Sequence, residues 1–370
     1  MPLRKKIMCI VGTRPEAIKM APVIQALLQQ PWVQLRVVVT AQHRHMLDQV
    51  FSLFGLKADV DLDLMRDNQT LADISAATLS GIDRALANEN PNAVIAQGDT
   101  TTVLATAMAA FYRNIPFCHV EAGLRTYDLQ QPFPEEFNRQ VASRLARLHF
   151  APTSGARENL IREGTPSSAI VLTGNTVIDA LLWMVERKPE LPVEVRPASR
   201  VILATVHRRE SFGDGLNAIC RAIRTIVDTN SDVDVILPVH PNPNVRSVVM
   251  SHLVSHNQIK LVEPLAYGGF VAALQRATIV LTDSGGVQEE APALGKPVLV
   301  MRTTTERPEA VQAGVARLVG VDEEVIRSQV QQLLDDPSYY SSMAKGASPY
   351  GDGNAASRIV VALKSLLSGE

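Results

Sequence analysis

The sequence predicts an α/β protein with two Rossmann-like domains, each built on a parallel β-sheet. Short apolar and β-branched runs alternate with helix-length segments along the whole chain, which is the pattern of βαβ units. Several of these runs end in a small or helix-capping residue, as expected where a strand turns into a helix. The 370 residues exceed one ordinary domain and are enough for two.

The first half of the chain contains the strands of the first predicted sheet. The earliest strand leads into Thr13 and Glu16, which are spaced as a helix-capping box, with Pro15 at the helix start. An alternating run at residues 59–64 is typical of an edge strand. The main strands are predicted at residues 7–11, 35–40, 93–97, 116–120, 148–152 and 170–173.

The second half of the chain repeats this plan after a proline-rich and charged interval at residues 188–200. A last helix is expected at residues 356–367, after a break rich in glycine. Strands are predicted at residues 201–205, 233–239, 259–262, 278–282 and 298–301. We therefore expect one domain at residues 1–172 and the other at residues 173–354.

The segment at residues 278–309 is predicted to bind a phosphate or diphosphate. Its strand stops before Ser284, a good N-cap, and Gly285 and Gly286 then open a helix. The N-terminus of a helix offers unpaired N–H donors and a partial positive charge, and glycine lets a ligand approach the backbone. Glu289 or Glu290, or both, can accept hydrogen bonds from ribose hydroxyls; the alternative is that they only complement the helix dipole.

Three carboxylates follow strand or loop ends in the first half, namely Asp99, Glu121 and Glu135. The carboxyl ends of parallel strands meet at one edge of a sheet, so these groups can converge there and exchange protons with a substrate. Two of them also have a purely structural interpretation. Asp99 can cap a helix, and Glu135 can form an i, i+4 salt bridge with Arg139.

Basic residues near other strand ends can meet an anionic ligand. Arg14 and Lys19 follow the first strand, and His207 lies in a basic cluster after residue 205. His207 can hydrogen-bond a phosphate, act as an acid or be a structural histidine. The loop at residues 263–270 can present backbone donors and an aromatic ring to a base.

Composition argues against several other classes of protein. The formal net charge of −2 gives no general attraction to nucleic acid or to an anionic membrane, and no segment reaches the length of a membrane span. The three cysteines are far apart, which argues against disulfides and zinc and agrees with a reducing cytoplasm. His43 and His45 have metal-like spacing without a nearby acidic partner, so no metal is expected.

Several long motifs resemble those of the non-hydrolysing UDP-N-acetylglucosamine 2-epimerases, over about residues 7–365. The resemblance implies a GT-B architecture with the active site in the interdomain cleft, a C-terminal helix at residues 355–370 packed back on the first domain, a homodimer and no cofactor. The matching stretches include GTRPEAIKMAPVI, GDTTTVLATAMAAFY, HVEAGLRT, PFPEEFNR and DSGGVQEEAPALGKPVLVMRTTTERPEA.

The resemblance also implies a reaction, the inversion of C2 in UDP-GlcNAc to give UDP-ManNAc, and a role for each matching residue. The implied diphosphate contacts are Ser284, Gly285 and Gly286; Glu290 would bind the ribose, Leu265 and Phe270 the uracil, and Arg14, Lys19 and Arg307 the charged parts of the substrate. Asp99, Glu121 and Glu135 would handle protons, with Arg139 orienting them and His207 near the leaving group. Gln42, Arg208 and His240 match positions that bind an activating second UDP-GlcNAc in some bacterial members.

The sequence departs from the family pattern at a few positions, and other functions are open. Val206 stands where glycine is expected, and His45 differs from the residue expected at a regulatory position. Leu265, Gly268 and Gly269 replace bulkier or polar residues, so we expect the uracil to be contacted there through the main chain. The alternatives are a retaining GT-B glycosyltransferase, a hydrolysing epimerase that releases ManNAc and UDP, and a non-catalytic sensor of nucleotide sugars.

Overall fold

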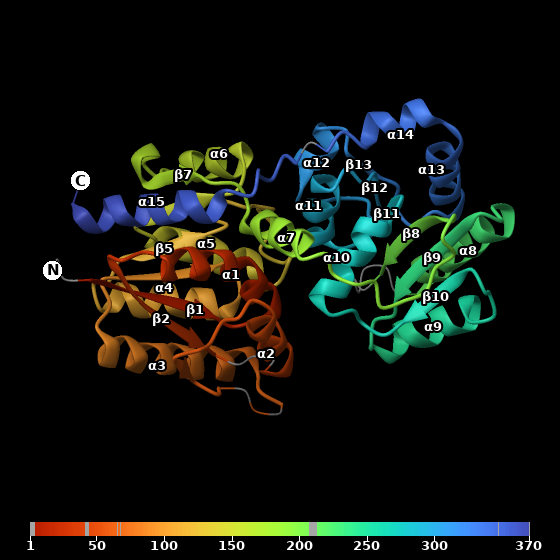
Figure 1. Cartoon of the computed structure of the whole chain (residues 1–370). Helices are drawn as coiled ribbons and strands as arrows, with labels where there is room; N and C mark the ends of the chain where they lie inside the picture. The colour runs from red at the N-terminus through yellow and green to blue at the C-terminus, as the bar shows by residue number, and fades with distance from the viewer. Residues whose placement is uncertain are drawn as a thin grey trace. The chain divides into compact units, whose positions relative to one another are not determined.

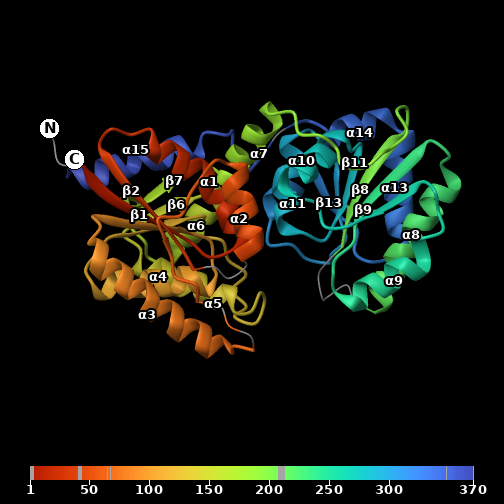
Figure 2. The same cartoon turned by 60° about the horizontal axis from the view of Figure 1, so that its bottom comes forward.

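The computed structural model describes residues 4–40, 44–64, 66, 68–206, 213–346 and 348–369. The chain divides into two compact units: the first unit is Met1–Ala180 with Tyr350–Glu370, and the second unit is Leu181–Pro349. Figures 1 and 2 show both units from two directions, coloured from red at the N-terminus to blue at the C-terminus. Each unit has its own parallel sheet, which confirms the predicted fold class.

The sheet of the first unit has seven strands in the order β3-β2-β1-β4-β5-β6-β7. All its pairings are parallel, and the strand order reverses between β1 and β4. Ligands of open α/β sheets bind at the carboxyl ends of the strands beside such a reversal. The strands are β1 (Lys5–Val11), β2 (Val33–Val39), β3 (Val60–Asp61), β4 (Ala93–Gln97), β5 (Phe117–Val120), β6 (Leu148–Ala151) and β7 (Ile170–Leu172).

Helices cover both faces of this sheet. α3, α4 and α5 pack in sequence on one face, and α1 contacts α2 and α15 on the other. This double cover explains why residues 7–11 of β1 and residues 93–96 of β4 are continuous buried apolar runs. The helices are α1 (Arg14–Leu28), α2 (Arg44–Leu53), α3 (Leu71–Glu89), α4 (Thr101–Tyr112), α5 (Glu135–Leu145), α6 (Ser154–Arg162), α7 (Thr176–Glu186) and α15 (Ala355–Ser368), with a short 3₁₀ turn η1 (Ser167–Ala169).

The sheet of the second unit has six parallel strands in the order β10-β9-β8-β11-β12-β13, and its order reverses between β8 and β11. The strands are β8 (Arg200–Thr205), β9 (Val233–Pro238), β10 (Ile259–Val262), β11 (Ile279–Thr282), β12 (Val298–Val300) and β13 (Ala316–Leu318). The helices are α8 (Asp214–Thr229), α9 (Pro243–Leu253), α10 (Tyr267–Arg276), α11 (Gly285–Ala293), α12 (Pro308–Gln312), α13 (Glu323–Asp335) and α14 (Pro337–Met343).

Most predicted strands are found, and the differences concern short edge elements. The edge strand predicted at residues 59–64 is only two residues long, Val60–Asp61. β13 was not predicted at all. Its three residues are too few to display a period of two, and its pairing with β12 defines it as a strand.

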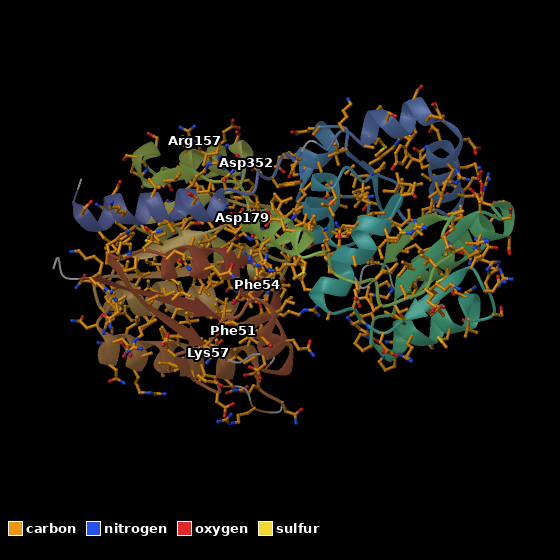
Figure 3. All side chains as sticks on the ribbon, in the orientation of Figure 1. Phe51, Phe54, Lys57, Arg157, Asp179 and Asp352 are labelled. Atoms are coloured by element: carbon orange, nitrogen blue, oxygen red, sulfur yellow. The ribbon has the colours of Figure 1, made fainter. Side chains whose placement is uncertain are left out.

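Hydrogen bonds attach the C-terminal segment, which begins at Tyr350, to the first unit. The N–H of Asn175 donates to the carbonyl of Tyr350 at 2.6 Å. The carboxylate of Asp179 on α7 then accepts the N–H groups of Ala355 and Ala356 at 3.2 and 2.8 Å. Asp179 is labelled in Figure 3 near the start of α15. A side chain 176 positions earlier therefore caps this helix.

None of the helices in the described part of the chain is both long and apolar enough to cross a bilayer.

Candidate functional site

The loop after β1 is fixed by Glu16. Thr13 is the N-cap of α1 and forms the predicted capping box with Glu16. The Glu16 carboxylate accepts the N–H of Gly12 at 2.5 Å and the hydroxyl of Thr100 at 2.6 Å, so it joins the loops that follow β1 and β4. Burial raises the pKa of Glu16 to about 7, against the opposite effect of these hydrogen bonds.

Glu121 follows β5 directly and is buried beside a lysine from α1. The Lys19 ammonium donates to Oε2 of Glu121 at 2.5 Å, and the Gln97 amide donates to the same oxygen at 2.8 Å. Glu121 has a positive φ of 62°, which is uncommon for a residue other than glycine. Residues with such backbone angles occur most often at functional sites. The arrangement brings together two residues that the sequence predicted separately, Lys19 and Glu121.

Asp99 follows β4 and is held by α5. Its carboxylate forms an ion pair with Arg139, and its carbonyl accepts a hydrogen bond from Asn138 at 2.9 Å. Nε2 of His119 lies 2.7 Å from the carbonyl oxygen of Gly98, the residue before Asp99. Because a carbonyl can only accept, His119 carries its proton on Nε2.

The purely structural interpretations of Asp99 and Glu135 are therefore wrong. The N-cap of α4 is Thr100, so Asp99 does not cap that helix. Arg139 pairs with Asp99 and, at 3.3 Å, with Glu136, instead of forming the i, i+4 bridge to Glu135. Buried Glu136 also accepts the N–H groups of the loop after β5, and Glu135 opens α5 without a hydrogen bond or ion pair among the described residues.

Arg14 is the first residue of α1, at the same edge of the first sheet. Its guanidinium is partly buried, and this burial lowers the pKa of Arg14 from its usual value. An arginine pKa is so high that the side chain keeps its charge. Lys19 therefore supplies positive charge beside Glu121, and Arg14 supplies it at the end of β1.

The second unit contains the predicted anion site at the start of α11. Ser284 occupies the N-cap position, but its side chain makes no capping hydrogen bond, so the first N–H groups of the helix are not capped by it. Gly285 permits a close approach: a Cβ there would lie 3.1 Å from Cζ of Arg307. The guanidinium of Arg307 is thus placed over the beginning of the helix, where an anion is best stabilised.

The loop at residues 302–307 is braced against α11 by contacts that the sequence did not reveal. Nε of Arg307 donates to Glu289 at 2.9 Å, and the Thr305 hydroxyl donates to Gln288 at 2.7 Å. Glu306 pairs with both Arg302 and Arg307. No spacing rule links Gln288 to Thr305 or Glu289 to Arg307, so only the folded chain shows these two pairs.

Glu290 differs from Glu289 in its partner. The hydroxyl of Tyr267, at the start of α10, donates to Oε1 of Glu290 at 3.0 Å. Leu265 and Phe270 lie just before and within the first turn of the same helix, and both side chains are partly buried. Glu289 is thus bound by the guanidinium of Arg307, whereas Glu290 accepts a hydrogen bond from a neutral hydroxyl.

The predicted regulatory residues and His207 can be placed only in part. Gln42, His207 and Arg208 lie outside the described residues. His240 follows β9, and its Nδ1 accepts the N–H of Asn242 at 3.2 Å. Among the residues that the structure describes, no cluster of three His, Cys, Asp or Glu side chains could hold a metal ion.

The two units thus offer complementary chemistry. The first places two carboxylates, groups able to accept and donate protons, at the ends of neighbouring strands, and each is paired with a cation. The second offers a helix N-terminus and an arginine for phosphate oxygens.

Comparison with known proteins agrees with this chemistry. The sequence profile described as UDP-N-acetylglucosamine 2-epimerase matches residues 25–364. The chain is 50% identical to the UDP-N-acetylglucosamine 2-epimerase of Escherichia coli K12, over 97% of this chain and 98% of that protein. It also resembles the crystal structure of UDP-GlcNAc 2-epimerase from Neisseria meningitidis bound to UDP-GlcNAc, with a TM-score of 0.92, 46% identity and coverage of 97% and 100%.

A more distant structure shares the fold over the same length. The UDP-GlcNAc 2-epimerase of Methanocaldococcus jannaschii, in complex with UDP-GlcNAc and UDP, has a TM-score of 0.82 and 32% identity, with 97% of this chain and 99% of that chain covered. These matches confirm the family resemblance that the motifs indicated. The chain belongs to the UDP-N-acetylglucosamine 2-epimerase family.

Proposed function

We propose that the protein is a non-hydrolysing UDP-N-acetylglucosamine 2-epimerase, which interconverts UDP-GlcNAc and UDP-ManNAc. The observation that carries this proposal is the pair of carboxylates at the ends of β4 and β5, Asp99 and Glu121, each bound to a cation. Inversion at C2 requires removal of a proton from one face of the sugar and its return to the other. Two proton carriers in fixed positions suit that task.

The reaction proceeds by elimination and re-addition. A base takes the C2 proton, the C2–H electrons form a C1=C2 double bond, and the C1–O bond breaks so that UDP leaves with the electron pair. C2 of the bound glycal-like intermediate is then protonated on the opposite face, and a UDP oxygen attacks C1. The departing diphosphate is stabilised by the start of α11 and by Arg307.

In this proposal each unit has a separate task. Asp99, Glu121 and Glu135 of the first unit handle protons, with Arg139 orienting Asp99. In the second unit, Ser284, Gly285 and Gly286 hold the diphosphate, and Glu290 holds the ribose. Arg14 and Lys19 meet the charged parts of the substrate, and His207 acts near the leaving group.

The test is incubation of the protein with UDP-GlcNAc in D2O without an acceptor. We expect deuterium at C2 and the appearance of UDP-ManNAc, with no free sugar. Free ManNAc together with UDP would instead identify a hydrolysing epimerase. Folded protein that binds UDP-GlcNAc without any exchange would exclude both epimerases and leave the glycosyltransferase or the sensor.

Matched variants assign the proton carriers. Asp99→Asn and Glu121→Gln should lose exchange at C2 and retain affinity for UDP. Glu158→Gln changes an exposed carboxylate on α6 and should leave exchange unchanged. Loss of UDP binding or of the fold in the first two variants would make those residues structural.

The proposal extends to the setting of the enzyme. We expect a cytoplasmic homodimer that supplies ManNAc units for cell-envelope polysaccharide. Light scattering tests the dimer. A second UDP-GlcNAc is proposed as activator through Gln42, Arg208 and His240, and initial rates with UDP-ManNAc that do not change on addition of trace UDP-GlcNAc would rule this out.

A further inference from the structure

We propose that Tyr267 is a positioning residue that makes the site selective for a ribonucleotide, by fixing the carboxylate of Glu290 for the ribose hydroxyls. This inference rests on the proposed function, because it requires that the second unit binds UDP. It adds a determinant of specificity outside the segment that contacts the phosphates.

The hydrogen bond between these two residues joins two helices of the second unit. The Tyr267 hydroxyl lies 3.0 Å from Oε1 of Glu290, and the two residues are 23 positions apart. Tyr267 begins α10, and Glu290 lies in the second turn of α11. Both residues are buried, with exposed fractions of 5% and 6%. A contact made away from bulk water restricts the rotamers of both side chains, because neither can exchange its partner for solvent.

The chemistry of the pair defines the direction of the bond. A carboxylate can only accept, so the tyrosine hydroxyl donates. Burial raises the pKa of Tyr267 well above its usual value, and the neighbouring Glu290 raises it further. The hydroxyl therefore stays protonated throughout the working range of pH and always directs its proton at Glu290.

The bond leaves Glu290 able to recognise a sugar. A carboxylate offers about four acceptor positions on its two oxygens, and the hydrogen bond from Tyr267 uses only one position on Oε1. A site built to pair with hydroxyl groups discriminates strongly against a ligand that lacks them, because its buried acceptors are then left without donors.

The position of Tyr267 also links two parts of the nucleotide site. It lies between Leu265 and Phe270, the residues expected beside the uracil, and it contacts the helix expected to hold the diphosphate. A displacement at the start of α10 is therefore transmitted to Glu290. Glu289 instead accepts a hydrogen bond from the guanidinium of Arg307.

The experiment compares Tyr267→Phe with the wild type in isothermal titrations with UDP and with 2′,3′-dideoxy-UDP. The wild type should bind UDP more tightly than the dideoxy analogue. Tyr267→Phe should weaken UDP binding about tenfold and change binding of the analogue less than about twofold, since only the ribose contacts depend on the missing hydroxyl. The KM for UDP-GlcNAc should rise by a similar factor, with kcat changed less.

Tyr340→Phe is the matched control. The Tyr340 hydroxyl is also partly buried in the second unit and donates to the carbonyl of Thr278 at 3.2 Å. Its removal should change the affinities for UDP and the analogue equally or not at all. If Tyr267→Phe is too unstable for titration, the thermal shifts produced by the two ligands give the same comparison.

The outcomes separate this inference from the function on which it rests. Equal weakening of both ligands by Tyr267→Phe, or no weakening of either, would overturn the positioning role. Equal affinity of the wild type for both ligands would overturn it as well, because Glu290 would then not read the hydroxyls. A wild type that binds neither ligand would instead contradict the proposed nucleotide site itself.

Discussion

The ammonium group of Lys19 lies 2.5 Å from Oε2 of Glu121, although the two residues are 102 positions apart in the sequence. Both side chains are largely buried, with exposed fractions of 12% and 6%. The end of β5 therefore holds a carboxylate that is paired with a cation from α1. This pair provides the first test of how the site is held together.

Replacement of Lys19 by methionine should destabilise the protein because Glu121 would lose its cation while remaining buried. We expect a loss of about 3 kcal/mol in the free energy of unfolding, measured in urea. Glu121→Gln in the Lys19→Met background should recover part of this loss, because a neutral amide does not need the ammonium. Strictly additive effects of the two substitutions would show that the pair is not coupled.

Glu16 should make the stability of the protein depend on pH. The folded pKa of about 7 lies above the value of 4.5 for an exposed glutamate, so the folded state binds more protons between these values. The contribution of Glu16 to stability is then complete below pH 4.5 and is lost as the pH rises through 7. Relative to Glu16→Gln, the wild type should lose about 2 kcal/mol of unfolding free energy between pH 5 and pH 8. A constant difference between the two proteins would refute this.

His119 and His149 should have the opposite effect. Burial lowers the pKa of each to about 4, below the usual value of 6.5, so the unfolded chain binds more protons between these values. The stability they provide is present above pH 6.5 and is lost as the pH falls toward 4. His119→Asn and His149→Asn should each reduce the slope of unfolding free energy against pH, between pH 4 and 6.5, by about 1 kcal/mol per pH unit. An unchanged acid limb in both variants would contradict the neutral state of these histidines.

Two adjacent glycines in α11 should respond differently to alanine. The added Cβ of Gly285→Ala would meet Arg307 and Glu306, so thermal stability and UDP affinity should both fall. At Gly286 a Cβ meets nothing within 4 Å of the protein, so Gly286→Ala should fold normally and lose UDP affinity only because it obstructs the phosphate. Gly215→Ala, at the start of α8, is the control and should affect neither. Unchanged UDP binding by Gly286→Ala would place the diphosphate elsewhere.

The cap provided by Asp179 should stabilise α15. Asp179→Ala leaves the N–H groups of Ala355 and Ala356 without their acceptor, which should lower the free energy of unfolding by about 1 to 2 kcal/mol. Asp352→Ala is the comparison, because the ion pair of Asp352 with Arg358 is about half exposed and should contribute less than about 1 kcal/mol. A larger effect at Asp352 than at Asp179 would reverse our interpretation of how this helix is held.

The elements of both sheets are encoded locally, which is why they could be predicted. Residues 7–11 are a continuous apolar run because β1 is covered on both faces, and Thr13 with Glu16 begins α1 as the spacing indicated. The same local chemistry marks the start of α11 at Gly285, after an N-cap serine. Turn residues, caps and apolar periods act within a few positions, so they can be recognised without knowledge of the fold.

The pairing of side chains was decided by the tertiary structure. Asp99 could have capped α4, and Arg139 could have paired with Glu135 one turn away; the fold instead brings Asp99 and Arg139 together from the end of β4 and from α5. Tyr267 and Glu290 meet in the same way, from the start of α10 and the second turn of α11. The local sequence therefore determines where strands and helices begin and end. Strand order and helix packing determine which charged and polar groups become partners. Such partners lie far apart along the chain, and only packing brings them within hydrogen-bond distance.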